Sequence, residues 1–179
     1  MALEFIGHLL LNRRADQSLS VWEKLVSDEG ITVTSPSFDE GGSIPKEHAG
    51  RGVGDNVSPA LAWSGVPVTA SHLVFVLEDV DVPFARPLIH TIAIVPPDAT
   101  ALAEGELARG ATSVHLLRGL MGEGYRGPRP IPGHGAHHYR FMLFAVDADV
   151  DTSSQKAAIE SMAGHVVARG RLVGTYEQP

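Results

Sequence analysis

The apolar residues of this chain fall into short runs, and these runs predict β-strands. Residues 73–78 and 89–95 are rich in valine, isoleucine and leucine, which is typical of strands in the middle of a sheet. Pro96-Pro97 ends the second run, because proline has no N–H to donate to a neighbouring strand. Residues 98–121 look irregular. Shorter or alternating patterns predict further strands at 31–34, 139–146 and 171–176.

Helical patterns are confined to the two ends of the chain. Residues 2 to about 28 favour helix, and Ser18 or Ser20 is a candidate N-cap for the second half of this stretch. Thr152–Gln155 resembles a capping box and opens a helix that is predicted to run to about Ala168. Strands in the middle and helices at the ends predict an antiparallel β core with peripheral helices.

The chain is long enough for one domain with a substantial core, and it divides into two parts. Residues 1–30 form the predicted N-terminal helical extension, and residues 31–179 form the predicted β domain. The extension is expected to pack on the β domain or on a second copy of the chain. A homodimer is therefore one of the expected partner states.

Charge and composition narrow the partners. The formal net charge of −7 argues against nucleic acid and against an anionic membrane surface, since both favour basic patches. The absence of cysteine excludes disulfides and thiolate chemistry. The apolar segment 5–11 lies between Glu4 and Arg13-Arg14, which reverses the charge order of a signal peptide, and it is too short to span a bilayer. We expect a cytoplasmic protein with no integral membrane segment.

Residues 122–139 combine a stiff backbone with polar side chains. Glycines and prolines surround Tyr125 and three histidines, and the segment leads into the predicted strand 139–146. Glycine and proline fix the shape of a loop, and histidine and tyrosine donate hydrogen bonds. A rigid sheet that delivers such a loop is a usual way to build a binding site.

Three segments carry a specific set of motifs in chain order. Residues 58–67 read SPALAWSGVP, residues 79–83 read DVDVP ahead of His90, and residues 127–139 read GPRPIPGHGAHHY. This set resembles the phosphatidylethanolamine-binding protein family, also called Raf kinase inhibitor-like proteins. The closing GTYE at 174–177 is similar to the compact bacterial and archaeal members of the YbhB/YbcL type. The resemblance covers roughly residue 31 to the C-terminus.

The resemblance implies an all-β fold, with two antiparallel sheets in a Greek-key sandwich and a small pocket that binds phosphate-like anions or phospho-headgroups. The ligand-binding residues implied by matching position are Asp79, His90, His137 and Tyr139, with Asp81 close behind, Pro130 and Gly133 at the rim, and Tyr176 near the C-terminus.

The chain departs from the family pattern at three places, one of which is the usual Pro-Pro pair, here Pro130-Ile131. Family members usually carry D-P-D-A-P, whereas Val80 and Val82 stand here at the intervening positions. Aromatic residues usually flank the strand histidine, but its neighbours here are Leu88, Ile89 and Thr91. Because cation–π contacts need aromatic rings, these changes remove contacts that recognition of a choline- or ethanolamine-like group would use.

A pocket of this composition can hold an anion through converging donors. His90 and His137 would donate N–H groups and Tyr139 its hydroxyl. A carboxylate beside an imidazole favours the protonated ring, so Asp79 is expected to keep His90 cationic or to fix its tautomer. Phosphate binding is therefore expected to be tighter at mildly acidic pH.

Metal chemistry is the first alternative for these residues, and we expect no metal and no cofactor. Asp79 and Asp81 alternate sides at a strand end, so one is expected to face the pocket and the other to hold the turn. His134, His137 and His138 lie in a segment too rich in glycine and proline for the helical spacing of many zinc sites. The remaining histidines, including His48, belong to no recognisable motif.

The preferred function is non-catalytic binding of a phosphate-like anion or phospho-headgroup. Family resemblance raises a second function, inhibition of a kinase or protease, in which the pocket rim receives an acidic or phosphorylated segment of a protein partner. A third is hydrolysis of an ester or phosphate ester with a His–Asp pair as acid and base. Ser58 and Ser64 are poor nucleophile candidates, since neither lies in a G-x-S-x-G motif.

Overall fold

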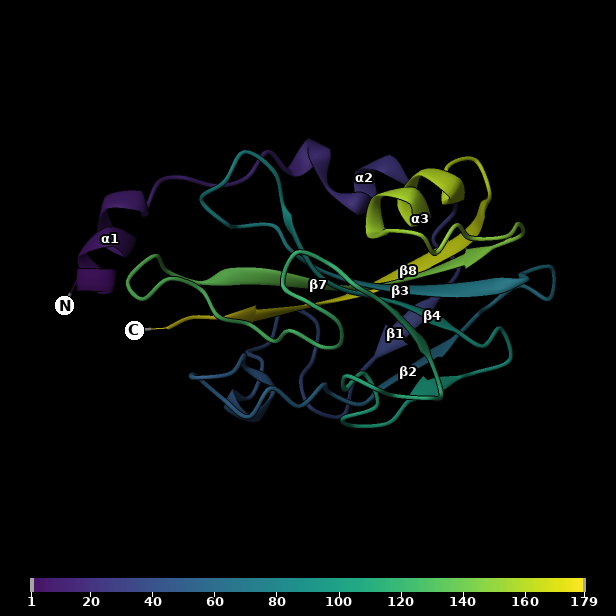
Figure 1. Cartoon of the computed structure of the whole chain (residues 1–179), viewed down its shortest axis with the longest axis horizontal. Coiled ribbons are helices and arrows are strands. Elements are labelled where there is room, and N and C mark those ends of the chain that lie inside the picture. The colour runs from purple at the N-terminus through teal and green to yellow at the C-terminus, as the bar shows by residue number, and fades with distance from the viewer. Residues whose placement is uncertain (1, 179) are drawn as a thin grey trace.

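The computed structural model describes residues 2–178. The α-helices lie toward the two ends of the chain and most strands lie between them, with strand β8 as the last element (Figure 1). In chain order the elements are α1 (Ala2–Leu10), the 3-10 helix η1 (Gln17–Leu19), α2 (Val21–Lys24), β1 (Thr32–Thr34), the 3-10 helix η2 (Lys46–His48), β2 (Leu61–Ser64), β3 (His72–Asp79), β4 (Leu88–Val95), β5 (Ala101–Leu102), β6 (His115–Leu117), β7 (His137–Val146), α3 (Gln155–Met162) and β8 (Val166–Tyr176).

The strands form two sheets. The larger sheet has the order β6-β4-β3-β7-β8, and the smaller has the order β1-β2-β5. Every pairing between these strands is antiparallel. The predicted all-β fold with two antiparallel sheets and peripheral helices is therefore confirmed, and its Greek-key connection stays a prediction.

The larger sheet is buried on both faces, and β3 shows why its sequence is a continuous apolar run. Alternate side chains of a strand point to opposite faces. Leu73, Phe75 and Leu77 face the smaller sheet and pack in the main core. Val74 and Val76 face the other way, toward the helices.

Helices α2 and α3 cover the outer face of the larger sheet, opposite the smaller sheet (Figure 1). Trp22 of α2 packs against Phe144 of β7 with ring centroids 6.1 Å apart. Met162 of α3 is fully buried in the same cluster. This outer cluster explains the helical spacing of apolar residues near Trp22, although Val26 at the end of that pattern is exposed.

Several predicted boundaries are wrong. The helix predicted to reach Ala168 ends at Met162, and the strand predicted at 171–176 begins at Val166. Gly164, with a φ of 82°, adopts a left-handed conformation just after the helix and separates it from the strand. The long β7 offers its whole edge to β8, and this pairing extends the strand beyond its apolar pattern.

The remaining differences concern weak local signals. The predicted helix over 2–28 is broken into α1, η1 and α2, and Ser20 is the N-cap of α2, with its hydroxyl accepting from the Glu23 N–H. The strands β2, β5 and β6 were not predicted. They have two to four residues each, so cross-strand pairing rather than periodicity defines them.

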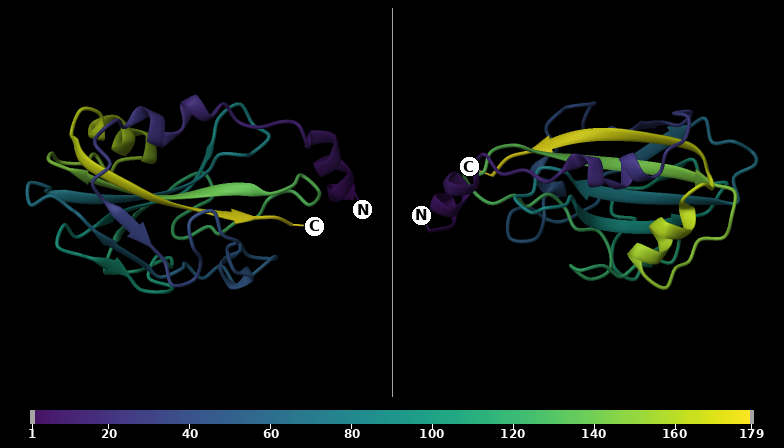
Figure 2. Two further views of the ribbon diagram at one scale, coloured as in Figure 1. Left: turned by 180° about the vertical axis from the view of Figure 1, so that it is seen from behind. Right: turned by 90° about the horizontal axis from the view of Figure 1, so that it is seen from above.

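Helix α1 of the N-terminal extension lies at the same end of the molecule as the C-terminus (Figure 2). Gly7 of α1 lies directly against Pro132 and His134, with no room for a side chain between them. The division at residue 30 stays a prediction. Within residues 2–178, the helices are all too short or too polar to cross a membrane.

Candidate functional site

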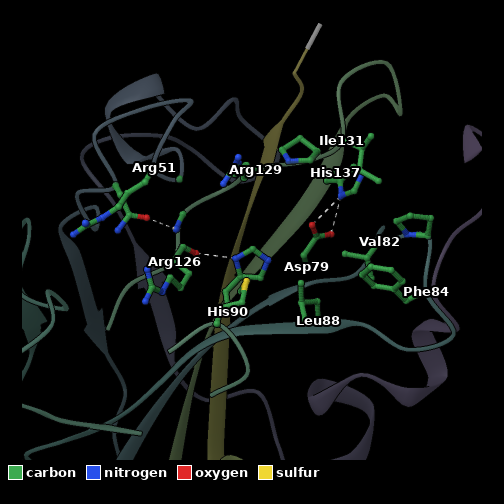
Figure 3. Close-up of a pocket in the computed structure, with 16 residues that line it drawn as sticks. Arg51, Asp79, Val82, Phe84, Leu88, His90, Arg126, Arg129, Ile131 and His137 are labelled. Atoms are coloured by element: carbon green, nitrogen blue, oxygen red, sulfur yellow. Dashed lines mark hydrogen bonds and ion pairs between the residues drawn. The ribbon is translucent and has the colours of Figure 1, made fainter. Parts of the chain in front are cut away.

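One end of the larger sheet carries a pocket of about 420 Å³. Antiparallel pairing brings the end of β3 next to the starts of β4 and β7, so Asp79, His90 and His137 lie at the same end of the sheet. Figure 3 shows the side chains that surround the opening. The lining residues are Gly50, Arg51, Asn56, Asp79, Val82, Pro83, Phe84, Leu88, His90, Met121, Arg126, Gly127, Arg129, Pro130, Ile131 and His137.

A hydrogen-bonded pair forms one wall of the pocket. The Asp79 carboxylate lies 2.8 and 3.1 Å from Nδ1 of His137, and both side chains are almost fully buried. Nε2 of His137 lies 2.6 Å from Nδ1 of His134, so both ring nitrogens of His137 are engaged. The expected pairing of Asp79 with His90 is thus replaced by a pairing with His137.

His134 carries this chain of hydrogen bonds to the N-terminal extension. Its Nε2 lies 2.8 Å from the carbonyl oxygen of Leu10 and 3.1 Å from that of Arg13. A proton on Nε2 satisfies these two carbonyl oxygens, whereas the other neutral tautomer leaves Nε2 free to accept from Arg14. The Arg14 guanidinium, 3.0 Å from the same nitrogen, donates to the carbonyls of Leu11 and Arg13. Burial, His137 and Arg14 all lower the pKa of His134, which favours the neutral ring.

His90 is the second histidine that lines the pocket. Its Nδ1 donates to the carbonyl oxygen of Arg126 at 2.8 Å, and its buried Nε2 has no hydrogen-bond partner. Burial lowers the pKa of His90, and the nearby Asp79 charge offsets only part of this effect. The lowered pKa favours a neutral His90 with a lone pair on Nε2 rather than the cationic ring, and the Arg126 carbonyl, not Asp79, fixes its tautomer.

Tyr139 lies behind these two histidines. Its ring meets His90 edge-on, with centroids 5.5 Å apart, and stacks on His137 at 6.4 Å. The buried hydroxyl has no hydrogen-bond partner. Burial raises the pKa of Tyr139, and Asp79 raises it further, so the hydroxyl stays protonated and remains a donor.

Three arginines at the pocket were missed in the sequence. Arg51, Arg126 and Arg129 line it, and the last two belong to the loop 122–139 that the sequence predicts to be a binding loop. The Asn56 side chain joins the two arginine-bearing loops, since it donates to the Tyr125 carbonyl at 2.9 Å and accepts from the Gly127 N–H at 3.0 Å. The arginines within GYRGPRP were the signal that could have revealed this.

An aromatic ring reaches the pocket from an unexpected position. Phe84, directly after the DVDVP motif, lines the opening on the side of Val82 and is 60% exposed (Figure 3). The positions beside His90 hold no aromatic residue, and the aliphatic Leu88 lines the pocket. An apolar wall is therefore present, although it is built differently from the family pattern.

Comparison with known proteins is consistent with this architecture. The family model for phosphatidylethanolamine-binding protein matches residues 34–177. The chain belongs to this family. A UPF0098 protein of Methanothermobacter thermautotrophicus is 35% identical over 156 residues, covering 83% of this chain and 99% of the relative.

Two solved structures of the phosphatidylethanolamine-binding protein family share the fold. YbcL of E. coli has a TM-score of 0.76 at 26% identity, covering 84% of this chain and 99% of its own. The putative homologue CT736 of Chlamydia trachomatis has a TM-score of 0.72 at 31% identity, covering 85% of this chain and 100% of its own. The family relationship thus extends to bacterial and archaeal members.

The residues suggested by the phosphatidylethanolamine-binding protein motifs divide into two groups. Asp79, His90, His137 and Pro130 line the pocket, with Tyr139 behind them. The other three do not line it and are Asp81, Gly133 and Tyr176.

Asp81 contacts the start of β7 and the N-terminal extension instead of the pocket, and the turn is held by Asp79, whose carboxylate accepts from the Asp81 N–H at 2.9 Å. The Asp81 carboxylate accepts from the backbone N–H of His138 and lies 2.7 Å from the Nδ1 of that ring. Arg14 lies 3.3 Å from the other carboxylate oxygen. Gly133 touches His8 of α1, and Tyr176 pairs with His137 across β7 and β8.

Proposed function

We propose that this protein binds phosphate-like anions, including phospho-headgroups, in the pocket between His90 and His137, without catalysing a reaction on them. The observation that carries the proposal is the charge of the lining. Three arginines stand there against one carboxylate, Asp79, which is hydrogen-bonded to His137, in a chain with a net charge of −7. A concave site with this balance concentrates anions locally.

The lining supplies both parts of a phospho-headgroup site. Guanidinium groups bind phosphate oxygens in a planar, often bidentate geometry, which suits Arg126 and Arg129. The free Nε2 of His90 can accept a proton from a P–OH group. Leu88, Phe84 and other apolar lining residues offer contact to the organic part of the ligand.

The surroundings of the His–Asp pair support binding more than hydrolysis. Both nitrogens of His137 are occupied by Asp79 and His134, so the ring has no free position toward a substrate. Ser58 is buried and accepts from the Leu107 N–H, and Ser64 lies on β2 of the smaller sheet. The pocket lining, within the described part of the chain, contains no serine or threonine.

Calorimetry with the full chain tests the proposal. Titrations with inorganic phosphate, phosphoethanolamine and phosphocholine are expected to show saturable one-to-one binding. Arg126→Gln and Arg129→Gln should each weaken it about tenfold or more, the value of one charged hydrogen bond. Arg118→Gln is the matched control, because Arg118 is exposed and outside the pocket.

The same titrations at pH 5.5 and pH 8 test the role of His90. Its pKa is lowered, so the ring gains a proton, and becomes a donor to the anion, only as the pH falls. Binding is expected to be tighter at pH 5.5.

Three results would replace the proposal. If the arginine variants bind phosphate and the headgroups as tightly as the parent protein, the pocket is not the binding site. Turnover of chromogenic phosphate esters that His137→Ala abolishes would make the protein a hydrolase. If phosphopeptides bind and free headgroups do not, the protein partner of the inhibitor-type function is favoured instead.

A further inference from the structure

A second cluster of chemistry-bearing side chains lies outside the pocket. Glu47 and His48 come from η2, and Glu104 comes from the turn that follows β5. One ligand atom from each, either a carboxylate oxygen or a ring nitrogen, lies within 4.8 Å of the other two. None of the three residues lines the anion pocket.

His48 is the decisive member of this cluster. Its side chain is fully buried, and its Nδ1 donates to the carbonyl oxygen of Val57 at 2.9 Å. This bond places the proton on Nδ1 and leaves a lone pair on Nε2. Nε2 is buried and has no hydrogen-bond partner. An unsatisfied buried nitrogen is unfavourable and requires an explanation.

The groups that face this nitrogen are acceptors. Oε1 of Glu47 lies 3.6 Å from Nε2 of His48, too far for a hydrogen bond, and the Glu104 carboxylate completes the group. Two carboxylates and an imidazole lone pair repel one another unless a cation lies between them. We propose that Glu47, His48 and Glu104 bind a divalent transition-metal ion of the Zn²⁺ class.

The ligand set favours this class of ion over Mg²⁺ or Ca²⁺. Imidazole suits Zn²⁺ and its neighbours in the first transition row, whereas Mg²⁺ and Ca²⁺ prefer oxygen ligands alone. Two carboxylates balance the charge of a divalent ion. The carbonyl of Val57 on the far ring nitrogen is the partner that metal-binding histidines usually have. The Glu47 side chain is 58% exposed and is therefore free to close on the ion.

The site would fasten one wall of the anion pocket. The His48 carbonyl accepts from the Tyr125 hydroxyl at 2.9 Å, and the chain runs from η2 directly to Gly50 and Arg51 of the pocket. An ion between η2 and the Glu104 turn would hold this segment in place. Its role is structural, and it is independent of whether the pocket binds phosphate.

The test uses the full chain after chelator treatment, titrated with ZnCl₂ by calorimetry. One ion per chain is expected, and Co²⁺ should give the visible absorption of a low-symmetry site. The double variant Glu47→Gln, Glu104→Gln changes only exposed side chains and should weaken Zn²⁺ binding more than a hundredfold, beyond the usual effect of a second-shell change. Glu160→Gln, a similarly exposed glutamate on α3, is the matched control.

A spectroscopic readout separates this site from adventitious binding to other histidines, of which the chain has nine in all. The Nε2 resonance of His48 in a ¹⁵N-histidine-labelled sample should shift on addition of Zn²⁺. His48→Asn keeps a donor for the Val57 carbonyl and removes the ligand nitrogen, so it should also lose binding. Unchanged affinity in the double variant, or an unmoved His48 resonance, would overturn the proposal.

Discussion

Glu78 provides a prediction whose size can be worked out from its surroundings. It lies on β3 with a side chain that is almost fully buried beneath α2. Its carboxylate accepts from the Val21 N–H at 3.0 and 3.3 Å, and Arg140 is its cross-strand neighbour. Burial raises the pKa of Glu78 from the usual 4.5 to about 7, although the Val21 N–H and the Arg140 charge oppose the rise.

This raised pKa makes the stability of the protein depend on pH. The folded state favours protonated Glu78 more than the unfolded state does, so this contribution is fully present below pH 4.5. It is lost as the pH rises through about 7. At about 1.4 kcal/mol for each factor of ten in proton affinity, the full effect is about 3 kcal/mol.

Glu78→Gln removes the titration and keeps an oxygen for the Val21 N–H. Urea denaturation of parent and variant at several values between pH 5 and pH 8 measures the effect. The free energy of unfolding of the variant, relative to that of the parent, should rise with pH by about 2–3 kcal/mol. The histidines titrate in both proteins and cancel in this difference.

A constant difference between parent and variant across this range would refute the reasoning. It would mean that Glu78 ionises in the folded state as easily as in the unfolded chain. Glu160→Gln serves as the control, because Glu160 is exposed and forms an ion pair with Lys156 on the surface of α3. Its relative stability should not change with pH over this range.

Three further predictions concern packing and the N-terminal extension. Phe144→Ala should lower the free energy of unfolding by about 3–5 kcal/mol in urea, because the ring is fully buried under the helices. His134→Ala should speed deuterium exchange at residues 2–14 but not in the strands, since it removes hydrogen bonds to that segment; unchanged exchange there would contradict the role of His134. Gly127→Ala should lower both Tm and phosphate affinity, since a Cβ would collide with the His48 carbonyl at the pocket wall.

The local pattern of the chain determined its main strands. Residues in β3, β4 and β7 are apolar and β-branched over lengths that suit central strands, and these elements lie where the sequence predicts them. The motifs around Asp79, His90 and the loop before Tyr139 identified the family correctly. Such features are readable because they depend on residues near one another in the chain.

Only the tertiary structure decided which side chains of the candidate site are hydrogen-bonded to one another. Asp79 pairs with His137 rather than His90, and His134 links that pair to the N-terminal extension, because strand register and loop packing set these distances. Arg51 joins the pocket through a loop that Asn56 fixes, which no spacing rule predicts.

The structure also decided elements whose own sequence is ambiguous. The early part of β8, before residue 171, carries no clear strand pattern and becomes a strand because β7 presents a long edge to pair with. Glu104 approaches His48 only because the turn after β5 packs beside η2. Periodicity reports what one segment prefers, whereas pairing, burial and approach between distant segments exist only once the chain has folded.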